Sequence, residues 1–164
     1  MWQPFYMIKT MEHIKYMKIA LKEAQKAKEL DEVPIGAVIV LNGKVIAKAH
    51  NLREKNQSAT AHAEVLAINK ACKKLNSWRL NDCILYVTLE PCTMCVGASI
   101  LSRVDGIVYG AKDPKGGSLG SLYDISLIKG FNHYPWVVSG VCEEESAYIL
   151  KEFFKNKRKA ENKQ

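Results

Sequence analysis

A buried strand, a helix and a second buried strand follow one another between Cys83 and Tyr109. Residues 83–89 and 104–109 are short, largely apolar runs. Between them, residues at helical spacing form one face of a helix: Cys92, Cys95, Val96, Ser99 and Ile100. Two strands joined through a helix pair in parallel with a crossover connection. The unit therefore predicts an α/β fold with a partly parallel sheet.

The segment before this unit supplies a helix and a hairpin. Apolar residues recur at steps of three and four from about Glu12 to Leu30, which predicts a helix with one buried face. Two β-branched runs follow, separated by Asn42-Gly43. This dipeptide is favoured in tight turns between antiparallel strands.

Two further amphipathic helices are expected. Thr60 can cap a helix whose apolar positions are Val65, Ile68, Ala71, Cys72 and Leu75. The last helix carries Ala147, Leu150, Phe153 and Phe154 and is expected to fray into the polar residues 157–164. Residues 136–139 predict a final strand. Residues 113–121 form a glycine-rich loop that is long enough to have a function.

Length and composition indicate one cytoplasmic globular domain. A chain of 164 residues suits a single core, and its hydrophobic content of 48% is ordinary for such a protein. Neither a membrane-spanning run nor an export signal is evident, so no membrane partner is expected. The five cysteines are an odd number in a mid-sized chain, which argues against a secreted disulfide framework.

Positive charge is concentrated in two segments. The formal net charge is +7, and lysines crowd the first helix and the C-terminal residues. These lysines could form ordinary solvated helix faces, or they could form a surface that attracts phosphate groups. Charge alone does not decide between the two.

His62, Glu64, Cys92 and Cys95 form the most specific pattern in the chain. Two cysteines three apart at a helix start place both sulfurs on one side, where the helix dipole favours the thiolates that zinc requires. His62 supplies a third ligand from the start of the neighbouring helix. Because residues two apart do not share a helix face, a metal bound by His62 beside Glu64 should lie off that helix's N-terminal end.

Three ligands leave a tetrahedral zinc with an open position, which is typical of catalytic sites. A water there becomes acidic, and the non-ligand carboxylate of Glu64 can move its proton. The alternatives are a redox cysteine pair and a structural zinc ribbon. A ribbon needs a fourth ligand, which neither His50 nor His133 is well placed to supply.

The pattern H-x-E…P-C-x-x-C is the signature of zinc-dependent base deaminases. From about Met11 to Lys159 the chain resembles the bacterial tRNA adenosine deaminase family. The matching segments are Glu32-Val-Pro-Ile-Gly-Ala-Val, Thr60-Ala-His-Ala-Glu, Leu85-Tyr-Val-Thr-Leu-Glu-Pro-Cys-Thr-Met-Cys, Gly110-Ala-Lys-Asp, Gly120-Ser-Leu and Phe153-Phe.

The resemblance implies a cytidine-deaminase-like three-layer α/β/α sandwich with a mixed five-stranded sheet. The deaminase domain would cover residues 11–159. An N-terminal extension of residues 1–10, which could be disordered, would precede it, and a polar tail of residues 160–164 would follow it. The resemblance further implies one zinc ion per subunit and a homodimer.

The implied reaction is hydrolysis of adenosine to inosine at the wobble position, 34, of a tRNA anticodon loop. Zinc-bound hydroxide would attack C6 of the flipped adenine while Glu64 shuttles the protons. The tRNA anticodon stem-loop would be the partner. Three alternatives stay open: a free-base or nucleoside deaminase for guanine or cytosine, a riboflavin-pathway deaminase, and a zinc-stabilised RNA-binding module without catalysis.

Four substrate contacts are also implied by the resemblance. Asn51 would hydrogen-bond the base, which the backbone of Ala63 would also face. Asp113 would touch the sugar or backbone beside the target, and Phe154 would shape the pocket for flanking nucleotides. Ordinary structural roles are alternatives for three of them: Asn51 as a turn residue, Asp113 as a loop cap before Pro114, and Phe154 as core.

Overall fold

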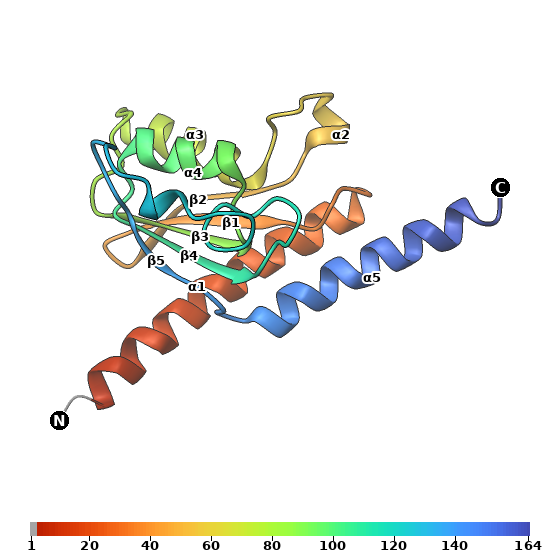
Figure 1. The fold of residues 1–164 in the computed structure, drawn as a ribbon, viewed down its shortest axis with the longest axis horizontal. Coiled ribbons are helices and arrows are strands. Elements are labelled where there is room, and N and C mark those ends of the chain that lie inside the picture. The colour runs from red at the N-terminus through yellow and green to blue at the C-terminus, as the bar shows by residue number, and fades with distance from the viewer. Residues whose placement is uncertain (1–2) are drawn as a thin grey trace.

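The computed structural model describes residues 3–164, with side chains from residue 9 onward. Its centre is a five-stranded sheet in the order β2-β1-β3-β4-β5 (Figure 1). The strands are β1 (Gly36–Leu41), β2 (Lys44–His50), β3 (Cys83–Leu89), β4 (Gly106–Ala111) and β5 (Trp136–Val138). β1 is antiparallel to β2 and β3, whereas β3, β4 and β5 run parallel. The expected mixed sheet is confirmed.

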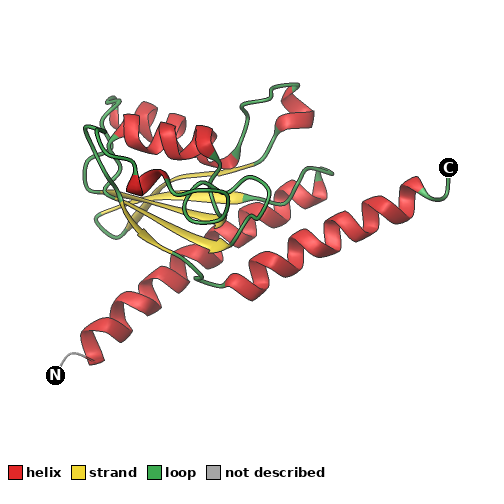
Figure 2. Ribbon diagram, viewed as in Figure 1, coloured by secondary structure: helices red, strands yellow, loops and turns green. Residues whose placement is uncertain are grey.

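Helices cover both faces of this sheet (Figure 2). α3 (Ala63–Leu75) and α4 (Thr93–Ser102) lie over one face, and α1 (Gln3–Glu29) and α5 (Glu143–Glu161) lie over the other. The short helix α2 (Arg53–Asn56) and the 3-10 turn η1 (Ile125–Leu127) lie in connections. The arrangement is the expected three-layer α/β/α sandwich.

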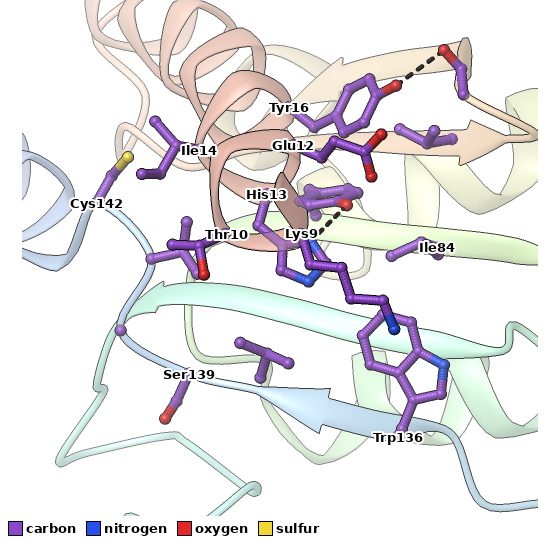
Figure 3. Close-up of a pocket in the computed structure, with 16 residues that line it drawn as sticks. Lys9, Thr10, Glu12, His13, Ile14, Tyr16, Ile84, Trp136, Ser139 and Cys142 are labelled. Atoms are coloured by element: carbon purple, nitrogen blue, oxygen red, sulfur yellow. Dashed lines mark hydrogen bonds between the residues drawn. The ribbon is translucent and has the colours of Figure 1, made fainter. Parts of the chain in front are cut away.

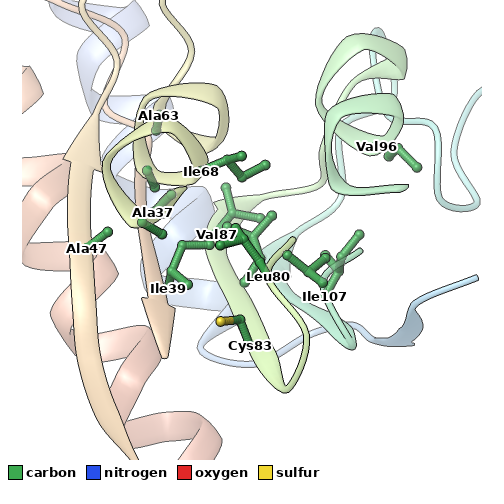
Figure 4. Close-up of a cluster of buried hydrophobic side chains, with 14 of the residues drawn as sticks. Ala37, Ile39, Ala47, Ala63, Ile68, Leu80, Cys83, Val87, Val96 and Ile107 are labelled. Carbon is green, nitrogen blue, oxygen red and sulfur yellow. The ribbon is translucent and has the colours of Figure 1, made fainter. Parts of the chain in front are cut away.

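Each face of the sheet has its own core. On the α3 and α4 side, strand residues such as Ile39, Val87 and Ile107 pack against Ile68 and Val96 of the helices (Figure 4). On the other side, α1 packs on the strand residues that point to the opposite face. This second core contains the helix residues Tyr16, Met17 and Ala20 and the strand residues Val38, Tyr86 and Val108. Successive strand residues point to opposite faces, so burial of both faces explains the continuous apolar runs.

The β1–β2 turn follows its sequence prediction. Asn42 and Gly43 have φ values of 49° and 76°. A two-residue type I′ turn requires positive φ at both central positions, and this pair adopts it readily. The predicted hairpin is therefore confirmed.

Three predicted helix ends were wrong. α1 begins at Gln3 rather than near Glu12, because no glycine and no proline beyond its first turn interrupt the segment. It thereby includes residues 3–10, expected as an extension, while residues 1–2 lie outside the described part. α5 continues to Glu161 instead of fraying at Lys157.

Across residues 3–164 no helix combines the length and apolar character that crossing a membrane requires.

The start of α3 differs as well. Its N-cap is His62 and not Thr60. The carbonyl of Ala61 accepts a hydrogen bond from Leu52 N at 3.0 Å, so the chain is held in a non-helical path up to His62. The helix can begin only after that tertiary contact.

Candidate metal centre

His62, Cys92 and Cys95 meet where α3 and α4 begin. His62 is the N-cap of α3, Cys92 is the N-cap of α4, and Cys95 lies in the first turn of α4. The Nδ1 atom of His62 lies 3.6 Å from the Sγ atom of each cysteine. At ordinary bond lengths, a tetrahedral zinc spaces its nitrogen and sulfur ligands about 3.6 Å apart. The two nitrogen–sulfur separations therefore match those around a zinc ion.

The sheet topology explains this position. Cys92 follows the parallel strand β3, and the loop of residues 112–121 follows its parallel neighbour β4. The carboxyl ends of parallel strands share one edge of a sheet, where α/β proteins place their ligand sites. Helix starts, ligands and loop are thus gathered at that edge.

The local electrostatics favour a thiolate. The pKa of Cys92 is lowered to about 4, chiefly by a hydrogen bond from Cys95 and also by His62, while burial opposes the shift. The hydrogen bond to Cys92, together with burial, raises the pKa of Cys95. In turn, the hydrogen bond with Cys92 raises the pKa of His62. Zinc binds deprotonated cysteine, so one ligand is already in the binding form at neutral pH.

Among the side chains that the structure describes, no fourth protein ligand joins the cluster. Within residues 9–164, only His62, Cys92 and Cys95 form a group with metal-binding geometry, their ligand atoms all lying within 4.8 Å of one another. His50 faces Glu23 at 3.4 Å, and His133 Nε2 lies 2.6 Å from the carbonyl of Val104. A metal held here would keep a position open for water or substrate.

Glu64 lies in the first turn of α3, two residues from His62, and is only 4% exposed. Burial raises the pKa of Glu64 above its usual value, although a hydrogen bond from Cys95 opposes the shift. Burial disfavours the charged carboxylate, so this group is poised to take up a proton. That property suits a general acid and base.

Asn51 and Ala63 are both buried. Asn51 directly follows β2; its Nδ2 donates to Val33 O at 3.3 Å, and its Oδ1 accepts from Arg53 N at 3.4 Å. Both hydrogen bonds are long, so they hold the amide weakly. Ala63, the first residue of α3, separates His62 from Glu64.

Asp113 and Phe154 occupy different settings. Asp113 Oδ1 accepts from Lys115 N at 3.1 Å, the local turn contact expected of a loop cap. Phe154 is 44% exposed, whereas its neighbour Phe153 is 7% exposed. Phe154 is therefore not a core residue, and its ring meets Phe153 edge-on with centroids 5.3 Å apart.

Sequence reasoning missed two buried carboxylates that hold connecting segments. Glu32, 1% exposed, accepts hydrogen bonds from the backbone N–H groups of Glu54 and Lys55 at 3.3 and 2.6 Å. Glu90, 2% exposed, holds the loop after β4. Each residue borders a largely apolar run, Glu32 before residues 33–41 and Glu90 after residues 83–89. That position was the available signal, because buried charges need partners.

Part of the positive charge holds two helices together. Lys18 and Lys28 of α1 pair with Glu145 and Glu152 of α5. Lys157 of α5 pairs with Asp31 at 2.7 Å. Within the described part of the chain, several basic residues of α5 are exposed and make no ion pair within 4 Å: Lys151, Lys155, Arg158 and Lys159. The C-terminal half of α5 extends past the sheet on the side where β3 and β4 end (Figure 1).

A separate cavity lies on the opposite face of the sheet. It has a volume of about 740 Å³ and lies between α1 and the strands, with His13, Tyr86 and Trp136 in its lining (Figure 3). His13 Nδ1 is 2.8 Å from the Tyr86 hydroxyl. None of the three clustered ligands lines this cavity, so it is distinct from the metal centre.

Comparison with known proteins places this geometry in context. The family model for MafB19-like deaminases matches residues 11–158. The tRNA-specific adenosine deaminase of Bacillus subtilis (strain 168) is 58% identical over 144 residues, which cover 88% of this chain and 89% of the relative.

Solved structures agree with this placement. One comes from a study of A-to-I editing by tRNA:A34 deaminases at the wobble position of transfer RNA. It is 47% identical, has a TM-score of 0.79, and aligns over 83% of this chain and 99% of its own. The guanine deaminase of Bacillus subtilis is 33% identical, with a TM-score of 0.59 and coverages of 87% and 92%.

Proposed function

Because the chain belongs to the MafB19-like deaminase family, we propose that it hydrolyses adenosine to inosine at wobble position 34 of a tRNA anticodon loop. One observation carries the proposal: a three-ligand His/Cys/Cys cluster lies beside the buried carboxylate of Glu64. A relative of 58% identity is named a tRNA-specific adenosine deaminase, which supports adenosine in tRNA as the substrate.

His62, Cys92 and Cys95 would hold one zinc ion per chain. When bound, zinc lowers the pKa of a coordinated water toward neutrality. Glu64 takes one proton from the attacking water and passes it to the adenine ring nitrogen. It then takes the second proton from the hydroxyl group now on C6 and gives it to the amine, which leaves as ammonia. Its raised pKa supports this role, because the group must exist in both protonation states during one turnover.

Four residues would contact the RNA. The weakly held amide of Asn51 can exchange its long internal hydrogen bonds for the edge of a flipped base. The backbone of Ala63 would face the same base. Asp113 would touch the sugar or phosphate next to the target. The exposed ring of Phe154 can stack on a flanking base, since unpaired bases commonly stack on aromatic side chains.

The unpaired basic residues of α5 supply the attraction to phosphate. They extend beyond the sheet on the side of the metal centre, where a tRNA loop entering the site would pass (Figure 1). A tRNA substrate would place the enzyme in the cytoplasm.

A homodimer is proposed on the exposed apolar residues near α4 and η1. Leu101 lies in the last turn of α4 and is 71% exposed. Leu127 of η1 is 78% exposed. A second copy of the chain would remove them from water. Light scattering on the purified protein measures the mass: a monomer at micromolar concentration would contradict this assignment.

The deciding experiment follows inosine at position 34. Purified protein is incubated with a tRNA anticodon stem-loop carrying A34, and separately with free guanine, cytosine and adenosine. Inosine in the stem-loop is expected, while ammonia from a free base alone would establish the alternative deaminase. Glu64→Gln should keep its zinc and lose activity by about 10²- to 10⁴-fold. Unchanged activity in that variant would refute the assigned role of Glu64.

A further inference from the structure

One buried carboxylate ties the loop after β4 to the metal-binding segment. Glu90 directly follows β3 and precedes Pro91 and Cys92. Its carboxylate accepts backbone hydrogen bonds from Asp113 at 3.2 Å, from Leu119 at 3.0 Å and from Ser121 at 3.2 Å. The Ser121 hydroxyl donates a further one. Both ends of the 113–121 loop are thus held by a single side chain.

The loop is shaped to receive this carboxylate. A Cβ atom built on Gly117 would lie 2.2 Å from Glu90 Oε2, so only glycine leaves room for it. Next to Gly117, Ser118 N donates to Pro91 O at 3.0 Å, and the Ser118 hydroxyl lies 2.9 Å from Thr93 Oγ1. Thr93 stands between the two cysteine ligands. Loop and ligand segment are consequently connected at several points.

We propose that Glu90 is a positioning residue for the substrate. It holds Asp113 at a fixed distance from Cys92 and Cys95, so that one bound nucleotide can contact Asp113 while its base lies at the metal centre. This inference rests on the proposed function, because Asp113 is taken to contact the RNA. Glu90 itself is fully occupied by the loop and touches no reacting atom.

The chemistry of the contacts requires a carboxylate. Four N–H and O–H donors converge on Glu90, and an ionised carboxylate is an acceptor at both oxygens. In Glu90→Gln, an NH₂ group of equal size must face at least one of those donors. A buried donor then loses its partner, which is costly, and the loop is released while the shape of the side chain is kept.

The test compares steady-state kinetics on the A34 stem-loop. Glu90→Gln should raise KM about tenfold, the loss expected for one hydrogen bond to a charged group, with kcat within about threefold of the wild type and zinc content unchanged. Gly117→Ala should raise KM at least as much, because its methyl group would meet both the Glu90 carboxylate and, at 2.7 Å, the backbone carbonyl of Asp113. Glu23→Gln is the matched control. Glu23 is also buried, but its carboxylate pairs with Lys26 of α1 and His50 of β2, so KM should not change.

A double-mutant cycle separates positioning from general destabilisation. In an Asp113→Ala background, Glu90→Gln should leave KM unchanged, because the contact it supports is already gone. Independent, multiplicative effects of the two changes would overturn the proposal, and so would a wild-type KM in Glu90→Gln. If Glu90→Gln does not fold, Ser121→Ala removes one donor group and must show a smaller KM increase with the same coupling to Asp113. Wild-type protein that forms no inosine would instead refute the proposed function itself.

Discussion

The Nδ1 atom of His62 lies 3.6 Å from the Sγ atom of Cys95, although 33 residues separate them in the chain. Each residue lies at the start of a helix that packs on the sheet. The packing of α3 and α4 on the sheet thus brings the residues of the metal centre together.

Replacement of one sulfur should remove the metal. Cys95→Ser is expected to purify with little zinc and to lose activity at least about 100-fold, since three ligands hold a catalytic zinc and a serine hydroxyl replaces a thiolate poorly. Elemental analysis of the purified protein measures the zinc. Cys72→Ser is the control, because Cys72 lies near the far end of α3. A full zinc complement in Cys95→Ser would exclude Cys95 as a ligand.

The two adjacent phenylalanines of α5 should separate stability from recognition. Phe153→Ala removes a buried ring and should lower the free energy of unfolding by about 3 kcal/mol or more. Phe154→Ala removes an exposed ring and should cost less than about 1 kcal/mol, while raising KM for the stem-loop severalfold. Urea unfolding and kinetics measure the two effects. An unchanged KM in Phe154→Ala would exclude stacking by that ring.

The exposed basic face of α5 should determine the salt dependence of RNA binding. Lys155→Glu together with Lys159→Glu should weaken binding, and the slope of log Kd against log salt should fall by about one for each lysine that contacts phosphate. Fluorescence anisotropy with a labelled stem-loop measures both. The matched control is Lys73→Glu together with Lys74→Glu, which changes the net charge equally at two exposed residues roughly 17 Å along α3 from His62. Equal losses in the control would mean that net charge, and not this face, governs binding.

Glu23 should make stability depend on pH in the acid range. Burial alone would raise the pKa of Glu23, but hydrogen bonds from Lys26 and His50 outweigh it and lower the pKa below the usual 4.5. The folded state therefore binds fewer protons than the unfolded state near that pH. The contribution of Glu23 is fully present above about pH 4.5 and is lost as the pH falls through the lowered value.

Thermal unfolding of the wild type and of Glu23→Gln between pH 3 and 7 tests this linkage. The wild type should be more stable by a constant margin above about pH 5, and the margin should shrink at lower pH. A margin that grows on acidification would show the opposite sign of the pKa shift.

Local features were predictable from sequence because they depend on short-range chemistry. Asn42-Gly43 forces a tight hairpin wherever it lies between strands, and the apolar runs around α4 allow only a parallel pair with a helical crossover. The residues of the metal centre were identifiable because the joint pattern of His62, Glu64, Cys92 and Cys95 is far more specific than the cysteine pair alone.

Long-range contacts decided the rest. Thr60 has the local chemistry of a helix cap, but the bond from Leu52 to Ala61 moves the start of α3 to His62. Lysines that look alike in sequence divide into those that hold α1 to α5 and those that face solvent. The partners of Glu90 lie 23 to 31 residues away, beyond β4. A residue's own chemistry limits what it can bind, but which groups come within hydrogen-bonding distance is set by how the layers pack.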